Sequence, residues 1–305
     1  MRRRGKLRDW IEYAAVRAVC GLLATVPLPA ARRLADLLSD LLRAATPRWR
    51  RIARRNLELA FPERSAAERE ALLRGSYRNL GRVLLAVARL PQLTPRNVRD
   101  WIEYEGYEHF ERALARGRGV IFLTAHLGNW ELSSAAHALF GHPLTILVRP
   151  LDNPLLDRWL MQRRAWHGNR PVAKDRAARA SLRALQRNEA VGVLADQNVA
   201  GEDGVFVDFF GLAASATPAA GRLAVKTGAA VIPGFAFWNE GSGRYVLKFY
   251  GPIALVEGGD ARAASVENAQ RCQAALERAI RERPEQWLWM HRRWKRRPPG
   301  EPSLY

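Results

Sequence analysis

Apolar and polar positions follow two different periods along this chain. From residue 31 to residue 90, apolar side chains return every three or four positions, which is typical of amphipathic helices. The pattern predicts three helices, at 31–45, 48–61 and 65–90. Ser65 followed by Glu68 is a capping box that marks the start of the third helix. This part of the protein is therefore predicted to be helical throughout.

From about residue 105 the pattern changes to short runs of β-branched and aromatic residues separated by helical segments. Strands are predicted at 119–125, 144–150, 190–196, 229–238 and 245–253, and helices near 129–140, 153–166, 176–188 and 217–227. Such alternation indicates an α/β sheet with its site beyond the carboxyl ends of the strands. Because no repeat or linker interrupts the chain, we expect one domain with a helical N-terminal part.

The N-terminal segment is basic and then apolar, which raises the question of a membrane anchor. Its longest uncharged stretch, residues 18–31, contains Pro27 and Pro29 and is shorter than the about 20 apolar residues that a spanning helix needs. The pattern favours an interfacial helix with arginines on its polar face. A buried N-terminal helix and a true span remain alternatives, whereas a cleaved signal peptide fits less well.

Composition limits the classes of partner. The formal net charge of +19 comes mostly from arginine and predicts attraction to a polyanion, such as nucleic acid, anionic lipid headgroups, phosphorylated glycolipids or an acidic protein. The two cysteines, Cys20 and Cys272, are far apart in sequence, so a disulfide framework or a cysteine metal site is not expected. A reducing, cytosol-facing location fits this usage.

Candidate chemistry lies in the segment TAHLGNWELS, residues 124–133. His126 is predicted at the carboxyl end of a strand, Gly128 permits a tight turn, and Asn129 is a suitable N-cap for the next helix. Within one helix, five positions would separate two side chains by about 140°. His126 must therefore lie outside the helix to meet Glu131, which could then orient Nδ1–H and leave Nε2 as a general base. The alternative is a histidine that only bonds a backbone carbonyl.

Several ordered motifs carry a family resemblance. From about Asn56 to the C-terminus, the chain resembles the bacterial lipid A biosynthesis acyltransferases, the lauroyl and myristoyl transferases; the motifs are AHLGNWE, VRPLDNPLLDRWLMQRR, LADQN, FFGLAASATPAAGRLAVKTGAAVIP and PEQWLWMHRRWKRRPPGEPSLY. The resemblance implies a central mixed β-sheet flanked by helices, as in glycerolipid acyltransferases, with a helical membrane-associated N-terminal part. It also implies an enzyme at the cytoplasmic face of the bacterial inner membrane.

The implied reaction moves an acyl chain from acyl carrier protein to the hydroxyl of a hydroxyacyl chain on a Kdo-bearing lipid A precursor. In such families the histidine and acid of an HxxxxD/E motif are the catalytic pair, and these match His126 and Glu131. The wider superfamily usually has Asp where this chain has Glu. We expect direct transfer, in which His126 takes the acceptor's proton and Glu131 steadies the imidazolium. No GxSxG, HExxH or paired CxxC motif occurs, so we expect no acyl-enzyme, no metal and no cofactor beyond acyl carrier protein as co-substrate.

Four further residues are candidates for the same site. Arg149, at the end of a predicted strand, and Arg164, on the following helix, could stabilise the oxyanion or bind the acceptor's phosphates. Either could instead be a solvated or ion-paired arginine. Asp196 and Gln197, at the carboxyl end of another strand, could shape the pocket or hold the HLGNWE loop in place.

The resemblance also gives the charge a meaning, because acyl carrier proteins are acidic and lipid A precursors carry phosphates and carboxylates. The segment 290–302 is predicted to be a basic docking tail for one of them, with the acceptor headgroup preferred; its arginines are Arg292, Arg293, Arg296 and Arg297. The predicted organisation is N-terminal interfacial or anchoring helices at 1–45 and an acyltransferase domain at 46–305, made of a helical lead-in (46–104), an α/β core (105–258) and a C-terminal helix with the basic tail (259–305).

Two other functions are compatible with parts of the sequence. A pI near 11.1 is compatible with nucleic-acid binding, but the chain has no zinc finger and no evident RNA-recognition signature, so no nucleic-acid partner is expected. A related acyltransferase with another acceptor would use the same chemistry. Its acceptor could be a phosphatidylinositol mannoside, an ornithine-type lipid or a lysophospholipid.

Overall fold

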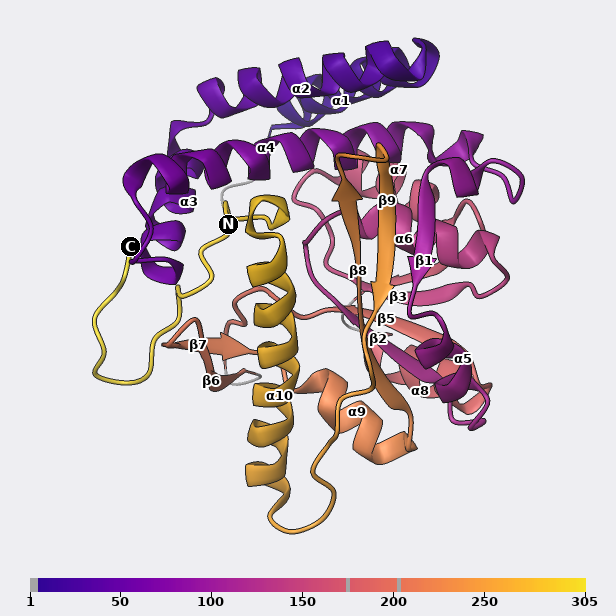
Figure 1. The fold of residues 1–305 in the computed structure, drawn as a ribbon, viewed down its shortest axis with the longest axis vertical. Helices are drawn as coiled ribbons and strands as arrows, with labels where there is room; N and C mark the ends of the chain where they lie inside the picture. Colours follow the sequence, from indigo (N-terminus) through magenta and orange to yellow (C-terminus); the bar gives the residue numbers. More distant parts are fainter. Residues whose placement is uncertain (1–4, 174–175, 202–203) are drawn as a thin grey trace.

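A seven-stranded mixed sheet forms the centre of the computed structural model, which describes residues 5–173, 176–201 and 204–305 (Figure 1). Its strands are β1 (Ile102–Glu105), β2 (Val120–Thr124), β3 (Leu144–Val148), β4 (Arg170–Ala173), β5 (Ala190–Leu194), β8 (Ala230–Asn239) and β9 (Arg244–Phe249). Their order is β1-β9-β8-β2-β5-β3-β4. Neighbours are parallel except β8 and β9, so β1 and β9 run opposite to the rest. The expectation of a mixed sheet is confirmed.

Helices cover both faces of the sheet because successive strand residues point to opposite sides. Ile121 and Leu123 of β2 are buried in one cluster with the helices α8 and α10, whereas Phe122 is buried in another cluster with α5 and α6. The helices of the first face are α8 (Ala177–Gln186), α9 (Ala219–Thr227) and α10 (Ala261–Glu282), and those of the second side are α5 (Glu108–Leu114), α6 (Trp130–Leu139) and α7 (Pro154–Ala165). A hairpin, β6 (Val205–Phe209) and β7 (Leu212–Ala216), packs on α10.

The N-terminal helices form a separate layer at one end of the sheet (Figure 1). They are α1 (Lys6–Thr25), α2 (Leu28–Ala45), α3 (Pro47–Ala60) and α4 (Ala66–Arg89), and α1 and α2 lie against α4. Leu23 of α1 and Ala35 of α2 are buried in one cluster with Val83 of α4. The predicted capping box is confirmed, since the side chain of Ser65 accepts from the Glu68 N–H and that of Glu68 from the Ser65 N–H. The domain boundary at residue 45 stays a prediction.

The outer side of this layer is apolar in places. The large exposed apolar side chains of α1 and α2 are Leu7, Trp10, Ile11, Leu22, Leu37 and Leu41. Among the helices of the described ranges, none combines the length and the apolar composition needed to cross a bilayer.

The predicted strands and helices are all found, with ends shifted by a few residues. Strands β1 and β4 and the β6–β7 hairpin were not predicted. Both β1 and β4 are four-residue edge strands with charged side chains, IEYE and RPVA, so neither shows the continuous apolar run of a central strand. The described ranges also contain the short 3₁₀ helices η1 (Leu90–Gln92), η2 (Val98–Asp100) and η4 (Pro284–Gln286). After η4 the chain is irregular to Tyr305.

Candidate active site

Strand register brings a histidine and a carboxylate together at the end of the sheet. Strands β2 and β5 are parallel neighbours, and Thr124 is paired with Leu194 at their last register position. Two residues further along each strand lie His126 and Asp196. The pairing continues beyond the strands, because the Ala195 N–H donates to the Thr124 carbonyl at 3.1 Å. His126 and Asp196 therefore meet side by side, although 70 positions separate them in sequence.

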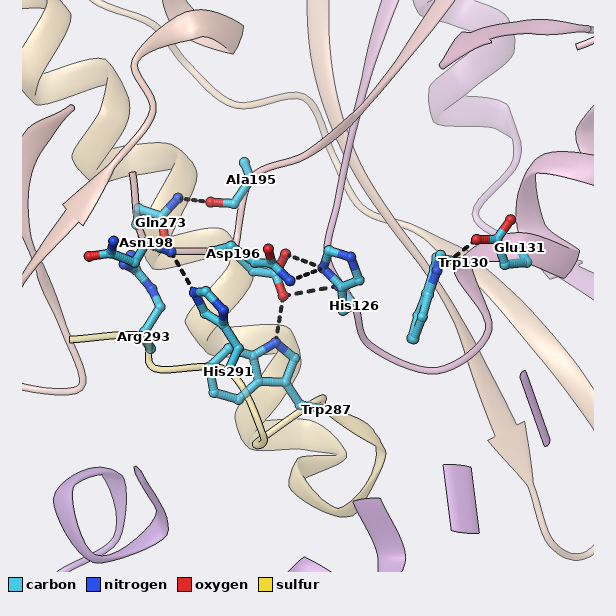
Figure 2. Close-up of polar contacts among 11 residues, drawn as sticks. His126, Trp130, Glu131, Ala195, Asp196, Asn198, Gln273, Trp287, His291 and Arg293 are labelled. Carbon is cyan, nitrogen blue, oxygen red and sulfur yellow. Dashed lines mark hydrogen bonds and ion pairs between the residues drawn. The ribbon is translucent and has the colours of Figure 1, made fainter. Parts of the chain in front are cut away.

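Asp196 contacts His126 with both carboxylate oxygens (Figure 2). Its Oδ1 lies 3.0 Å from the ring Nδ1, and its Oδ2 accepts from the His126 backbone N–H, also at 3.0 Å. A carboxylate on Nδ1 favours the tautomer with the proton on that atom, so Nε2 is left as an acceptor. The ring itself lines a cavity and is 23 % exposed, whereas Asp196 is 2 % exposed. This is the geometry of a general base with a buried orienting acid.

Asp196 has a third hydrogen bond that keeps it ionised. The indole Nε1–H of Trp287 donates to Oδ2 at 2.8 Å. Burial alone would raise the pKa of Asp196, but the adjacent His126 ring, the hydrogen bonds from that residue and the one from Trp287 together lower the pKa to about 2. The carboxylate is therefore charged at neutral pH.

The loop that carries His126 is held in place at Gly128 and Asn129. Gly128 has φ +62°, and a Cβ there would lie 1.9 Å from the Ala236 carbonyl oxygen, so only glycine fits. Asn129 is the N-cap of α6, as predicted, and its side chain accepts from the Leu132 N–H at 3.0 Å. From α4, Asn79 donates to the Gly128 carbonyl at 2.8 Å. These contacts set the position of His126 relative to the sheet.

Glu131 does not contact the imidazole, and the expectation that it orients His126 is wrong in geometry. Its carboxylate pairs with Arg164 of α7 through two nitrogens, with Nε at 3.0 Å from Oε2 and Nη2 at 2.5 Å from Oε1. The Trp130 indole also donates to it, at 3.2 Å. Figure 2 shows the Trp130 ring between His126 and the Glu131 carboxylate. The acid on Nδ1 is Asp196 instead.

The reason lies in where α6 begins. The predicted turn and helix start are present, with Trp130 as the first helical residue. Glu131 is thus in the first turn, but it is directed toward α7, where Arg164 compensates its buried charge. Burial opposes the charge of Arg164, but Glu131 outweighs that effect and raises the pKa of the guanidinium. The pair is a fixed ion pair beside the dyad.

A cavity of about 460 Å³ opens beside both pairs. It lies between α6 and the sheet, and His126, Glu131 and Arg164 are part of its lining. Its apolar wall comes from three neighbouring strands and consists of Phe122, Leu144, Ile146, Val148, Gly192 and Leu194. From Val148 at the carboxyl end to Leu144 at the start of β3, the wall extends about 13 Å. The cavity can hold a long apolar group with its polar end at the histidine.

The two candidate arginines lie at this cavity, as does Gln197. Arg149 is an exposed member of its rim, and Arg164 is mostly buried against Glu131. The Gln197 side chain lies with Nε2 3.4 Å from the ring Nδ1 of His126. Within the described ranges, no group of three His, Cys, Asp or Glu side chains could hold a metal ion. The expectations about metal and cofactor remain predictions.

The predicted docking tail is not a free basic surface. Arg293 is fully buried, donates to the Ser215 carbonyl at 2.7 Å and to Gln273 at 3.0 Å, and lies over the Phe209 ring. Burial lowers its pKa to about 10. The other three side chains are partly buried against this chain itself: Arg292 over Tyr305, Arg296 over Phe206, and Arg297 on the Ala213 carbonyl and Glu301. The segment packs back on the β6–β7 hairpin, where carbonyls of β7 accept from Arg293 and Arg297, and docking of a partner by this tail stays a prediction.

Two residues of the site were missed, both near the start of that C-terminal segment. The Gln286 carbonyl accepts from the Gly128 N–H at 3.1 Å, and the Trp287 indole holds Asp196. Both belong to the PEQWLWMHRR motif. Its tryptophans indicate a buried segment, whereas the docking-tail prediction was based on its arginines. His291 in the same segment accepts from the Asn198 N–H at 2.9 Å, and burial lowers its pKa to about 4.

The chain is similar in sequence to lipid A acyltransferases along nearly its whole length. Residues 2–296 match the family described as bacterial lipid A biosynthesis acyltransferase. Among curated proteins, the lipid A biosynthesis palmitoleoyltransferase of Escherichia coli (strain K12) is 29% identical over 299 residues, 98% of this chain and 95% of that protein. The lauroyltransferase of the same organism is 29% identical over 300 residues, with the same coverage. The myristoyltransferase is 28% identical over 303 residues, 98% of this chain and 91% of that protein.

Proposed function

We propose a specific reaction for this chain, which belongs to the bacterial lipid A biosynthesis acyltransferase family and is an acyltransferase. In this proposal the enzyme moves a lauroyl- or myristoyl-type chain from acyl carrier protein to a lipid A precursor. The acceptor is a hydroxyl of a hydroxyacyl chain on a Kdo-bearing precursor. His126 is the general base. The observation that carries the proposal is the His126–Asp196 dyad at the mouth of an apolar cavity.

The dyad supports direct transfer. The acceptor hydroxyl oxygen attacks the thioester carbonyl while His126 Nε2 takes its proton, and Asp196 stabilises the resulting imidazolium. When the tetrahedral intermediate collapses, the C–S bond breaks and the thiolate recovers that proton from the ring. An ester and a free carrier-protein thiol result, with no net change at the enzyme.

The ion pair of Glu131 and Arg164 supplies fixed charge next to the reacting atoms. The guanidinium binds Glu131 through Nε and Nη2, while Nη1 makes no hydrogen bond to a described residue. We assign Arg164 to the developing oxyanion, because a preoriented charged donor stabilises it more than a mobile one. Arg149, on the exposed rim, is assigned to a phosphate of the acceptor.

The acyl chain of the donor fits the apolar part of the cavity. Strands β2, β3 and β5 supply the wall, and α6 supplies Ser133 and Ser134 on the other side. An acyl group placed there has its carbonyl at His126 and its methyl end toward Leu144. An apolar cavity behind a polar mouth suits an enzyme that acts on long acyl chains.

We place the enzyme on the surface of the inner membrane, at its cytoplasmic face, and the N-terminal layer supports the contact with a membrane surface. Exposed Trp10 and Ile11 of α1 lie within one turn of Asp9, whose carbonyl accepts from Asn153 at 2.9 Å. Asn153 directly follows the cavity residue Asp152. The apolar outer face of α1 is thus near the cavity rim, where a lipid acceptor would enter, and the positive net charge favours anionic headgroups.

The test is transfer from lauroyl- and myristoyl-acyl carrier protein to a Kdo-modified tetra-acylated lipid A precursor, with a lysophospholipid as a competing acceptor. We expect wild-type transfer to the lipid A precursor and a loss of about 10² to 10⁴ in His126→Ala. The control is His109→Ala, a histidine on α5 away from the cavity. Transfer only to the lysophospholipid would leave the chemistry and overturn the acceptor. Near-wild-type turnover of folded His126→Ala would overturn the base.

A further inference from the structure

We propose that Trp287 is a positioning residue for acyl transfer, acting through Asp196. The inference rests on the proposed function, because it concerns the same dyad. The indole N–H fixes the carboxylate so that Oδ1 faces the imidazole Nδ1. Trp287 itself does not line the cavity.

Asp196 accepts three hydrogen bonds from the described residues. Oδ1 accepts from the ring of His126, while Oδ2 accepts from the His126 backbone at 3.0 Å and from Trp287 Nε1 at 2.8 Å. Without the indole, Oδ2 would accept only from the His126 backbone N–H, which belongs to the residue that Asp196 orients. A buried carboxylate with an unmet acceptor is free to rotate toward another partner. Among the described residues, the indole is therefore the one hydrogen-bond donor to Asp196 that does not come from His126.

Trp287 is rigid enough for this role. Its side chain is 1 % exposed, and its ring packs edge-on against Trp289, with centroids 4.5 Å apart, and against Phe209, 5.9 Å away. Its carbonyl accepts from the Ser76 hydroxyl of α4. The ring thus has little freedom, and its N–H cannot follow the carboxylate if the carboxylate moves.

The neighbours of Trp287 brace the other half of the dyad. The Gln286 carbonyl accepts from the Gly128 N–H at 3.1 Å, and the Leu288 N–H donates to the His126 carbonyl at 3.0 Å. One three-residue segment, 286–288, therefore contacts both the loop that carries the base and the acid that orients it. This explains why a C-terminal segment far from β2 in sequence lies behind the site (Figure 2).

Two other polar side chains near Asp196 do not share the role. The ring of His291 uses Nε2 to accept from the Asn198 N–H, and burial keeps that ring neutral. Arg293 directs its nitrogens to Ser215 and Gln273. Neither makes a hydrogen bond to the carboxylate, so the side-chain anchor is Trp287.

The chain provides a matched control in Trp289. This second tryptophan is fully buried, and its Nε1–H also makes one hydrogen bond, to the Pro284 carbonyl at 2.7 Å. Trp289→Phe and Trp287→Phe therefore remove the same chemical group from similar surroundings. Only Trp287→Phe removes a hydrogen bond to Asp196.

The experiment is a double-mutant cycle of Trp287→Phe and Asp196→Asn in the full chain, with Trp289→Phe alongside. We expect Trp287→Phe to lower kcat by about tenfold or more, as for loss of one hydrogen bond to a charged group, with KM for both substrates within about twofold. In the Asp196→Asn background the same change should alter kcat by less than about twofold. Trp289→Phe should leave kcat within about twofold, even if both tryptophan variants lower Tm.

Equal losses of kcat in the two tryptophan variants, or additivity of Trp287→Phe with Asp196→Asn, would overturn the inference. A second measurement does not depend on turnover: nitrogen-15 NMR of the His126 ring. Trp287→Phe should raise the fraction of the Nε2–H tautomer, and Trp289→Phe should not. If the wild type transferred no acyl chain but Trp287→Phe still changed the His126 tautomer, the proposed function would fail and the positioning of Asp196 by Trp287 would stand. If the tautomer did not change in Trp287→Phe, the positioning role of Trp287 would be refuted.

Discussion

Two buried carboxylates, Asp196 and Glu131, lie on opposite sides of the Trp130 ring and make contrasting pairs. Both are nearly inaccessible, at 2 % and 5 % side-chain exposure, and each accepts from a tryptophan N–H. Asp196 is paired with an imidazole, a ring that can both accept and donate a proton. Glu131 is paired with the guanidinium of Arg164, which stays charged. One pair can transfer protons, and the other can only hold charge in place.

The contrast shows that spacing along the chain is a poor guide to which carboxylate serves a histidine. Glu131 is five residues from His126, yet its carboxylate binds Arg164 of α7. Asp196 is distant in sequence, yet the parallel register of β2 and β5 places it at the ring. In this geometry the acid of the HxxxxE motif pairs with Arg164, and the carboxylate on Nδ1 of His126 is Asp196.

The largest expected effect comes from Asp196. Asp196→Asn removes the charge and can place an amide N–H toward Nδ1, which favours the wrong tautomer of His126, so kcat should fall by about 10²- to 10⁴-fold, no further than in His126→Ala. Steady-state kinetics with acyl carrier protein donors measures this loss. A decrease below about tenfold in a folded variant would show that Asp196 does not orient the base.

The same carboxylate predicts how stability responds to acid. The pKa of Asp196 is about 2 in the folded protein against an ordinary value of 3.8, so its contribution to the free energy of unfolding is present above about pH 4 and is lost as pH falls toward 2. Asp196→Asn should therefore have a flatter decrease of Tm over that range than wild type. Parallel curves would contradict the lowered pKa.

Glu131 should matter less for turnover and more for folding. Glu131→Gln leaves Arg164 buried without its counter-charge, which costs about 3–5 kcal/mol in comparable pairs. We expect a clear drop in Tm and a loss in kcat of about 10- to 100-fold, because Arg164 is displaced.

The double variant Glu131→Gln with Arg164→Met is the control for that prediction. It removes both charges and should recover most of the lost Tm without recovering kcat. Recovery of neither would mean that Glu131 stabilises the fold through some contact other than Arg164.

A smaller and more selective effect is expected at the apolar wall of the cavity. A Cβ on Gly192 would meet Leu144 Cδ1 at 3.7 Å, an ordinary contact, so Gly192→Ala shortens the cavity without strain. It should shift the ratio of kcat/KM toward the shorter donor by about tenfold, and Leu144→Ala should shift it toward the longer one. Leu123→Ala, a core change on the other face of β2, is the control. If Gly192→Ala and Leu144→Ala shifted the donor preference in the same direction, the placement of the acyl chain in this cavity would be refuted.

The smallest effect on chemistry is expected in the N-terminal layer. Replacing Leu7, Trp10 and Ile11 together by Gln should reduce binding to anionic vesicles by more than about tenfold while transfer to detergent-dispersed acceptor stays within about twofold. Deleting α1 would be a poorer test, because its Leu23 is fully buried. Val225→Gln, at an exposed apolar position on α9, is the matched control. Unchanged vesicle binding would refute the membrane-facing role.

Much of the fold could be predicted because its signals are local. The capping box at Ser65 and Glu68, the helical periods and the apolar runs of the central strands are all present as expected. The edge strands β1 and β4 could not be recognised, since four residues with charged side chains have no distinct period. The family resemblance added that the sheet is mixed, which no local pattern contains, and the strand order was not predicted.

The site was predicted less well because its decisive contacts are long-range. His126, Gly128 and Asn129 could be placed from one turn, but pairing Asp196 with His126 requires the register of two strands. The burial of Arg293 could not be inferred either, because its partners Ser215 and Gln273 come from other elements. From sequence alone, an arginine is expected to be exposed, because arginines are rarely buried unless the fold provides hydrogen-bond acceptors for them.

The most direct test of the account compares two double-mutant cycles for kcat, His126→Ala with Asp196→Asn and His126→Ala with Glu131→Gln. If Asp196 acts through the histidine, the first double variant should be about as slow as His126→Ala alone. Glu131 acts through Arg164, so the second double variant should be slower than His126→Ala by a further factor of about 10 to 100. The reverse pattern, with Glu131 coupled to His126 and Asp196 independent of it, would contradict the assignment of the dyad.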